Sequence, residues 1–344
     1  MLQAKAPRAT IQDVAALSGL SICTVSRALR NLPNVSASAQ AKVSDAAAKL
    51  GYKASTAASR LAGGTTGSVA IIAPTATAWF FAQAVEAAEE VFAGAGYDTV
   101  LISLRNRPSV HNKLFSDLAG LSQRVDGILL LNIALSEAEL AAVEASGLAV
   151  ASVGMHDVPW DNVGIDNAGA ARAATEHLLD LGHWDVAMLS GRETGEPSLI
   201  TANERLRGFE QALEAHHVTV DPDLVLEAGS SIEGGRLAMI ELIENRRMPS
   251  AILAGCDETA FGALMALRDH GLSAPKNMSI IGIDDHQMSW FLGLSTISQP
   301  VADQGAFAAN LLIDRLHRSG LPNPPSSHML ETKLIERKST RRRR

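Results

Sequence analysis

Short apolar runs alternate with segments of helical periodicity over most of the chain after Ser68. Because buried strands are short and apolar, seven of these runs predict strands: Val69–Ala73, Thr99–Leu104, Gly127–Leu131, Ala149–Val153, Val186–Leu189, Ala251–Ala254 and Ser279–Ile283. Segments between them have helical spacing, among them Phe81–Ala95, Ala168–Leu181 and Leu206–Ala215. This alternation is typical of parallel sheets covered by helices on both faces. Roughly 270 residues is large for one such sheet, so we expect two doubly wound subdomains.

The start of the chain shows a different pattern, that of short helices joined by tight turns. Thr10 with Asp13 three residues later predicts a capped helix start, and Gly19 predicts the end of that helix. Ser21 then predicts the N-cap of a second helix after a connection of only three residues. A connection this short that contains glycine is typical of a helix-turn-helix.

Spacing along these helices separates an inward face from an outward face. In the second helix, Val25 and Leu29 lie four residues apart and should pack inward. A third helix is expected from about Ser38 to a C-cap at Gly51, with an inward face of Val43, Ala46, Ala47 and Leu50. The outward residues of the second helix begin at the end that meets base edges in such units: Ile22, Cys23, Ser26 and Arg27.

Positive charge is concentrated in the same part of the chain. Residues 1–66 contain eight Lys or Arg and two Asp, whereas the whole chain carries a net charge of −7, so the remaining 278 residues carry −13. This asymmetry favours a small nucleic-acid-binding unit joined to an acidic globular body over a merely solubilising surface. The basic side chains can neutralise phosphates: Lys5, Arg8, Arg27, Arg30, Lys42, Lys49, Lys53 and Arg60.

The residues of this unit closely resemble the lac repressor (LacI/GalR) family of bacterial transcription regulators. The similarity runs through Ile11–Ser21, Thr24–Leu29, Val35–Ser36 and Leu50–Tyr52. The resemblance implies contacts with operator DNA by Ser21, Ile22, Cys23, Thr24, Ser26, Arg27, Asn34 and Ser36. On this interpretation Cys23 is a base-contacting position and not a redox site.

Residues 53–66 form the linker that follows. The resemblance implies a hinge helix that folds only on operator DNA and inserts a leucine between bases in the minor groove. Ser55 can cap a short helix over residues 56–62, which alone would be marginal in water. Leu61 corresponds to the inserted leucine, and Ser55, Leu61 and Ala62 are the expected contacts. Where the family usually has Pro-Asn, this chain has Ala54-Ser55.

Residues that follow the expected strands are the candidates for a ligand site, because parallel α/β folds bind ligands at the carboxyl ends of strands. Thr75 and three adjacent aromatic residues follow the first strand, in a chain of only 4% aromatic content: Trp79, Phe80 and Phe81. Such rings can stack on a sugar or a base, or pack in the core. We expect Trp79 near the rim, one of the two phenylalanines in the core and the other against the ligand.

Three carboxylates and an arginine form the second group of candidates: Asp166, Arg205, Asp257 and Asp284. Together they would suit a polyhydroxylated ligand, although for Asp166 and Asp257 a helix N-cap is an equally good interpretation. The resemblance implies ligand contact for Arg205, in an Arg-x-x-Gly-Phe motif, and for Asp284, in a Gly-x-Asp-Asp motif. Gly182-His183 and Ser295–Pro300 extend the resemblance over nearly the whole chain. Where many members have Asn-Asp, this chain has Cys256-Asp257, so no particular sugar follows.

The expected fold is an all-α helix-turn-helix domain joined to an α/β body of two doubly wound parallel-sheet subdomains, like that of periplasmic binding proteins. The domains are expected at 1–52 (helix-turn-helix), 53–66 (hinge and linker), 67–182 with 298–323 (first subdomain) and 183–297 with 324–338 (second subdomain). Residues 339–344 are expected to form a basic tail, most simply a disordered one. The C-terminal stretch has no leucine heptads, which favours a dimer over a tetramer.

Several other classes of protein fit the sequence less well. An enzyme is disfavoured, because the chain has no GxGxxG, GxxxxGK[ST] or GxSxG motif. A secreted sugar-binding protein would share the fold of the body but would need a signal peptide, which the N-terminus does not resemble. An architectural DNA-binding protein would not need a body with a cleft. Two distant cysteines and ten scattered histidines predict neither a disulfide framework nor a metal site.

The sequence therefore predicts a cytosolic, dimeric repressor without a cofactor, whose affinity for pseudo-palindromic operator DNA depends on a small metabolite. A sugar or sugar derivative is the expected effector. A purine or nucleoside acting as co-repressor is the alternative, and a non-regulatory sugar-binding protein is a weaker one.

Overall fold

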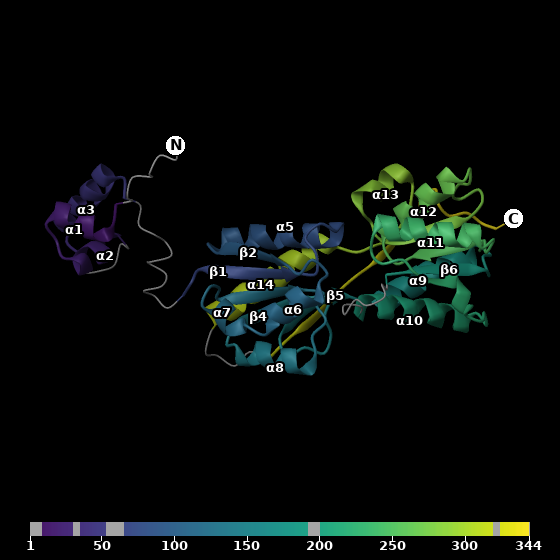
Figure 1. Cartoon of the computed structure of the whole chain (residues 1–344), viewed down its shortest axis with the longest axis horizontal. Coiled ribbons are helices and arrows are strands. Elements are labelled where there is room, and N and C mark those ends of the chain that lie inside the picture. The colour runs from purple at the N-terminus through teal and green to yellow at the C-terminus, as the bar shows by residue number, and fades with distance from the viewer. Residues whose placement is uncertain (1–8, 30–34, 53–64, 192–199, 319–323, 344) are drawn as a thin grey trace. The chain divides into compact units, whose positions relative to one another are not determined.

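The computed structural model describes residues 9–29, 35–52, 65–191, 200–318 and 324–343. These residues belong to two compact units, Met1–Gly67 and Ser68–Arg344 (Figure 1). No helix within the described ranges is long and apolar enough to cross a membrane.

The described residues of the first unit form three helices, α1 (Ile11–Ser18), α2 (Ile22–Leu29) and α3 (Ala37–Leu50). Thr10 and Asp13 form a capping box at the start of α1. Gly19 and Gly51 end α1 and α3 in the left-handed conformation, with φ of 68° and 60°, which glycine adopts without steric cost. These expected caps are confirmed. The small core consists of Val14, Ala15, Val25, Ala28, Val43, Ala46 and Ala47.

In the second unit, the body, the described residues form two six-stranded sheets. The first has the order β11-β5-β4-β3-β1-β2, and every neighbouring pair is parallel. Its strands are β1 (Ser68–Ala73), β2 (Asp98–Ser103), β3 (Gly127–Leu131), β4 (Ala149–Val153), β5 (Asp161–Ile165) and β11 (Ser327–Leu330).

The second sheet has the order β12-β10-β9-β8-β6-β7, and only β12 is antiparallel to its neighbour. Its strands are β6 (Val186–Ser190), β7 (Val225–Glu227), β8 (Ala251–Ala254), β9 (Ser279–Asp284), β10 (Ser295–Ser298) and β12 (Lys333–Ile335). All seven strands expected from the apolar runs are present in the two sheets, and their ends agree to within one residue. The expected fold class is thereby confirmed.

Helices cover both faces of each sheet, and each sheet with its helices is called a lobe below. In the first lobe, α5 (Trp79–Gly94) and α14 (Val301–His317) pack on one face. The other face is covered by α6 (Pro108–Phe115), α7 (Leu118–Ser122) and α8 (Glu137–Ala145). Both faces need a cover because side chains of a strand alternate between them, and in β1 both sets are apolar. Val69, Ile71 and Ala73 point to one core, and Ala70 and Ile72 point to the other.

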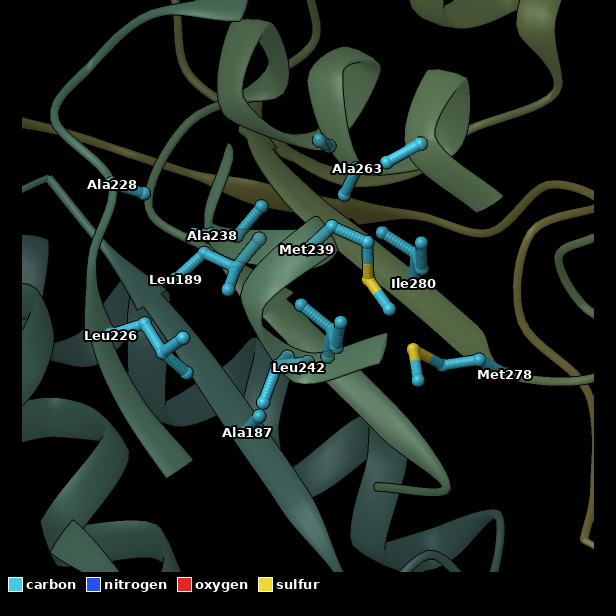
Figure 2. Close-up of a cluster of buried hydrophobic side chains, with 14 of the residues drawn as sticks. Ala187, Leu189, Leu226, Ala228, Ala238, Met239, Leu242, Ala263, Met278 and Ile280 are labelled. Carbon is cyan, nitrogen blue, oxygen red and sulfur yellow. The ribbon is translucent and has the colours of Figure 1, made fainter. Parts of the chain in front are cut away.

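The second lobe repeats this arrangement. α11 (Ile232–Glu244) and α12 (Asp257–Asp269) pack on one face of the second sheet, where Leu189 and Leu226 from strands meet Met239 and Leu242 from α11 (Figure 2). α9 (Asn167–Asp180) and α10 (Ile200–Ala215) cover the other face. A short helix, α13 (Gln287–Leu292), follows β9.

Glycines allow three helix pairs to approach closely. A Cβ atom on Gly208 of α10 would lie 2.0 Å from the backbone oxygen of Ala168 in α9. A Cβ atom on Gly262 of α12 would lie 1.9 Å from the backbone oxygen of Ile232 in α11. One on Gly305 of α14 would lie 2.3 Å from the backbone oxygen of Ala84 in α5. Any larger residue at these positions would force the helices apart.

Three connections between the two lobes follow from the described strands and helices, and two of them lie at other residues than expected. We expected the first crossing near residue 182, but α9 packs on the second sheet, so the crossing follows β5. The second crossing follows β10, as expected near residue 298. We expected the third at residue 323, but β11 pairs with β5, so it lies between β11 and β12. A helix that precedes a strand packs with the sheet of that strand, and composition alone does not show this.

The described residues at the C-terminal end, up to Arg343, are bound to the second lobe, which corrects the expectation of a disordered tail. Ser339 is buried, and its backbone oxygen accepts a hydrogen bond from the N–H of Ile280 at 2.9 Å. The Arg341 backbone oxygen accepts from the ring of His183 at 2.9 Å, and the N–H of Arg343 donates to Leu181 at 2.8 Å. The tail is thus a strap along the second lobe, held by backbone atoms that its basic composition does not reveal.

Candidate functional site

α2 presents the candidate DNA-contacting face of the first unit. The Oγ of Ser21 accepts a hydrogen bond from the backbone N–H of Thr24 at 3.1 Å and so begins the helix. Burial of Val25 against the small core fixes the side of α2 that faces out. On that side Ile22 is 48% exposed, and Cys23 is exposed beside it. An apolar side chain held open at the start of such a helix is suited to contact base edges.

Some of the other expected DNA contacts lie within the described residues, and the rest lie outside them. Ser26 and Arg27 are half-buried on α2, and the Oγ of Ser36 accepts from the N–H of Ala39 at 3.2 Å, which caps α3. Thr24 and Ser21 share a hydroxyl–hydroxyl hydrogen bond of 2.9 Å. The remaining candidates and the expected hinge helix lie outside the described residues: Asn34, Ser55, Leu61 and Ala62.

A cavity of about 790 Å³, its opening to solvent included, lies in the body and is lined from both lobes. Strand ends supply Asn132, Gly154 and Ile165 from the first sheet and Gly191, Gly255, Cys256 and Asp284 from the second. The beginnings of helices and the connecting segments complete the wall with Ala78, Phe80, Phe81, Asn167, Thr201, Ala202, Arg205, Ser230, Glu258, Gln299 and Gln304. A concave site at the carboxyl ends of parallel strands is where such folds bind small molecules.

Arg205 and Asp284 meet in this cavity, as predicted from the sequence. Their closest nitrogen and oxygen atoms lie 4.0 Å apart, and both side chains are buried. The guanidinium also donates to the backbone oxygen of Gly255 at 2.5 Å and to Oδ1 of Asn167 at 3.2 Å. Oδ1 of Asp284 accepts from Gln299 at 2.6 Å. Two charged groups in fixed positions can orient a polar ligand through charge-assisted hydrogen bonds.

The environment of Asp284 is unfavourable to its charge. Burial raises the pKa of Asp284 above its ordinary value, and the nearby Arg205 guanidinium and the Gln299 amide oppose this rise. The backbone of Asp284 has a φ of 134°, and Asp285 has a φ of 59°, both in the left-handed region that glycine prefers. A non-glycine residue in such a conformation is strained, and strain of this kind is concentrated at functional sites.

Asp257 does not line the cavity and is held inside the second lobe. Its carboxylate accepts hydrogen bonds from the hydroxyl of Ser289 at 2.6 Å, from the hydroxyl of Thr296 at 2.7 Å and from the N–H of His286 at 2.9 Å. Burial, aided by the charge of Asp284, raises the pKa of Asp257 to about 7. Asp257 is therefore an internal anchor for α13 and β10 outside the cavity wall. The alternative interpretation as a helix N-cap is wrong, since Cys256 holds that position.

Asp166 is a helix cap, and its neighbour lies in the cavity. Oδ1 of Asp166 accepts from the N–H of Gly169 at 2.8 Å at the start of α9. Asn167 is buried, lines the cavity and binds Arg205 and the carboxylate of Glu204. The interpretation of Asp166 as a helix N-cap is therefore confirmed, and the next residue, Asn167, is the one that lines the cavity.

The aromatic residues are divided differently from our expectation. Phe80 and Phe81 both line the cavity while also packing against the core of the first lobe, with ring centroids 5.3 Å apart in an edge-to-face arrangement. Trp79 packs against the ring of His286 in the second lobe, with centroids 4.8 Å apart. Thr75 is outside the cavity lining and shares a hydrogen bond with Thr77.

Direct hydrogen bonds join the lobes around the cavity. The hydroxyl of Thr201 in α10 donates to Oδ1 of Asn132 at 3.0 Å. The N–H of Trp79 donates to a carboxylate oxygen of Glu258 at 3.3 Å. Gln304 of α14 donates to Gln299 at 3.0 Å, which extends the chain from Asp284 into the first lobe. The cavity wall and the contacts between the lobes thus share residues.

Sequence reasoning did not identify the amides and hydroxyls of this wall. Asn132 follows a strand that the apolar runs predicted, so its position at a strand end could have indicated it. Gln299 lies in the Ser295–Pro300 run that the family resemblance singled out. Ser230 and Thr201 had no comparable signal. The strand before Ser230 has only three residues, and Thr201 lies in the first turn of a helix.

The described residues contain no group of three or more His, Cys, Asp or Glu side chains arranged to hold a metal ion. Burial raises the pKa of the Cys256 thiol to about 12, so the cysteine in the cavity wall stays protonated and is a poor nucleophile. The chemistry that the wall offers is hydrogen bonding and ring contact.

Comparison with known proteins adds two matches to domain families. Residues 10–55 match bacterial regulatory proteins of the lacI family, and residues 175–340 match a periplasmic binding protein-like domain. Over 343 residues the chain is 33% identical to the HTH-type transcriptional repressor PurR of Glaesserella parasuis, covering 97% of this chain and 98% of that protein.

Two solved structures show the same architecture. The lac repressor dimer bound to operator and the anti-inducer ONPF has a TM-score of 0.83 and 26% identity, with 97% of this chain and all of that chain covered. The complex of the transcriptional regulator CelR with cellobiose has a TM-score of 0.71 and 29% identity, with the same coverage.

Proposed function

The chain belongs to the lacI family of bacterial regulatory proteins, and from this membership we propose a transcriptional repressor controlled by a small metabolite. One observation carries the proposal. A capped helix-turn-helix with an exposed recognition face is joined in one chain to a body whose cavity is lined from two lobes. The first unit binds operator DNA, and the body receives the effector. Such a protein acts in the cytoplasm and needs no catalytic activity.

The proposed DNA contacts follow the exposed face of α2 and its flanks: Ser21, Ile22, Cys23, Thr24, Ser26, Arg27 and Ser36. Asn34, Ser55, Leu61 and Ala62 join them on the strength of the sequence alone. Phosphate contacts supply affinity for any DNA, and the side chains at the start of α2 supply the choice of sequence.

A dimeric repressor requires a two-fold symmetric site, and this gives the test of DNA binding. We expect selection of bound fragments from random DNA by the full chain to return an inverted repeat. Recovery of an asymmetric site, or no enrichment of any sequence, would show that the proposed mode of binding is mistaken. Arg27→Ala, which removes a cation from α2, is expected to weaken this enrichment.

The surface of α13 is the proposed contact between the two copies. Trp290 and Phe291 are each 71% exposed, and Met288 and Leu292 beside them are also exposed. The two rings pack edge to face, 5.0 Å apart. In a chain with 4% aromatic residues, a cluster of this kind on the surface is typical of a protein interface. The lac repressor, a structural relative, is a dimer in its solved complex with operator.

Trp290→Ser combined with Phe291→Ser is expected to convert the dimer to monomer at micromolar concentration, because most of the exposed apolar area of α13 is lost. Analytical ultracentrifugation measures the change. Trp184→Ser, which removes an exposed tryptophan elsewhere in the second lobe, is the control and should leave the dimer intact. A dimer of unchanged stability in the double variant would place the interface elsewhere.

The effector is a small polar metabolite, and a sugar or sugar derivative suits the cavity best. Carboxylate, guanidinium, amide and hydroxyl groups converge there, as hydroxyl-rich ligands require. CelR, which shares the fold, has been solved with cellobiose. The pair of phenylalanine rings supports a second candidate, a purine or nucleoside that stacks on Phe80 or Phe81.

Control of operator affinity by the effector follows from the position of the cavity between the lobes. A ligand that contacts both lobes favours one relative orientation of them, and that orientation sets the spacing of the paired DNA-binding units in the dimer. The shift in operator affinity is limited by the difference in ligand affinity between the two states.

A further inference from the structure

Helix α5 begins without a capping side chain of its own. Its N-cap residue is Ala78, which offers no side-chain acceptor to the free N–H groups of the first turn. The first of these groups, the N–H of Trp79, donates instead to Oε2 of Glu258 at 3.3 Å. Glu258 belongs to α12 in the second lobe, so a carboxylate of one lobe caps a helix of the other.

Ring contacts between the two lobes also hold the start of α5 in place. The ring of Trp79 lies against His286, and His286 in turn lies edge-on to Phe261 with centroids 5.1 Å apart. Nδ1 of His286 accepts from the N–H of Met288 at 2.9 Å, which fixes the orientation of the ring. Glu258 is half-buried at this contact and burial raises its pKa, so the carboxylate is partly removed from water. A negative charge at the start of a helix is favourable, because the free N–H groups carry partial positive charge.

Glu258 also changes the charge of the cavity that it lines. Among the described residues of the wall, Arg205 is the one cation, and Asp284 and Glu258 are the two carboxylates. With Glu258 present, negative groups outnumber positive ones, and the start of α5 is already occupied by a carboxylate. Without it, the charges of Arg205 and Asp284 would balance, and the uncapped N–H groups of α5 would be open to an anion.

We propose that Glu258 is the specificity-determining residue of the effector cavity. It closes the two lobes by capping α5, and it restricts the cavity to uncharged or cationic ligands with hydrogen-bond donors. Phosphorylated and other anionic metabolites are rejected, because they would compete with Glu258 for the same N–H groups and meet its charge. The inference rests on the proposed function only in taking this cavity as the effector site.

The test uses inorganic phosphate as the probe and the full chain in three variants. Glu258→Ala removes both the cap and the charge, whereas Glu258→Gln keeps an oxygen that can accept from Trp79 but removes the charge. Glu244→Gln, at an exposed end of α11, is the matched control. Thermal unfolding is measured over a range of phosphate concentrations, with chloride at equal ionic strength as the reference.

We expect a saturable rise in Tm with phosphate for both Glu258 variants, with apparent affinity at least tenfold higher than for the parent and for Glu244→Gln. Hydrogen–deuterium exchange should separate the cap from the charge. Protection at Trp79–Phe81 should persist in Glu258→Gln and fall in Glu258→Ala. An equal phosphate response in parent and variants, or unchanged protection in Glu258→Ala, would overturn the proposal. Neither readout involves DNA, so this outcome is distinct from failure of the repressor function.

Discussion

Asp257→Ala is expected to destabilise the body by about 3 kcal/mol, although Asp257 lies outside the cavity wall. The substitution leaves the N–H of His286 and the hydroxyls of Ser289 and Thr296 without their acceptor, and both hydroxyl residues are fully buried. Each unsatisfied buried group costs about 1–3 kcal/mol, and removal of a buried carboxylate offsets part of the sum. A fall in Tm of roughly 5–10 °C should follow.

Differential scanning calorimetry of the full chain measures this effect. The control is Asp269→Ala, at the exposed end of the same helix, which should stay within about 0.5 kcal/mol of the parent. If Asp257→Ala unfolds at the parental temperature, the hydrogen-bonded carboxylate does not anchor α13 and β10.

The pH dependence of stability provides a second test of the role of Asp257. Because the folded state raises the pKa of Asp257 from 3.8 to about 7, it binds the proton more tightly than the unfolded chain does. The raised pKa therefore adds to the free energy of unfolding below about pH 4, and this contribution is lost as the pH rises through about 7. In Asp257→Asn the decline in Tm between these values should therefore be smaller than in the parent.

Arg205→Ala and Asp284→Asn are expected to bind operator with parental affinity and to lose their response to the effector. Both residues are buried in the cavity and linked to each other, so either change removes a charged partner from a desolvated ligand contact. Such a loss weakens the free energy of effector binding by about 1.5–3 kcal/mol, which corresponds to a roughly ten- to hundredfold lower affinity for the effector. Asparagine is chosen for Asp284 because it tolerates the positive φ of this position better than alanine.

Operator titration over a range of effector concentrations measures the response. Asp166→Asn is the matched control, since the same change from carboxylate to amide is made at a helix cap outside the cavity wall. It should respond like the parent. If the Arg205 and Asp284 variants respond at parental concentrations, the effector binds elsewhere.

The elements defined by local signals were predictable from the sequence. Thr10, Gly19 and Gly51 mark helix ends through contacts with residues three to five positions away, and these positions are as expected. The central strands were equally clear, because burial on both faces makes them apolar throughout, as in Gly127–Leu131.

The rest depends on contacts between distant parts of the chain. The strands β7, β11 and β12 lie at sheet edges, are short and carry polar residues, so no apolar run marks them. The lobe to which α9 belongs is decided by packing on the second sheet and not by its own composition.

In the candidate site, sequence position found the strand ends but not the direction of the side chains. Arg205 and Asp284 lie in the cavity wall as expected, whereas the wall contains Asn167 in place of the expected Asp166. Glu258 had no signal of its own, because its role depends on a helix start 179 residues away in the sequence.

In the proposed function, a metabolite bound in the cavity controls operator affinity. The most direct test is titration of a fluorescent inverted-repeat fragment, obtained by selection, with the full chain. The titration is made with and without a metabolite that raises Tm in a screen. Effector control predicts a change in operator affinity of roughly 5- to 150-fold at saturating metabolite, in either direction. An operator affinity that stays the same when the cavity is saturated would contradict it.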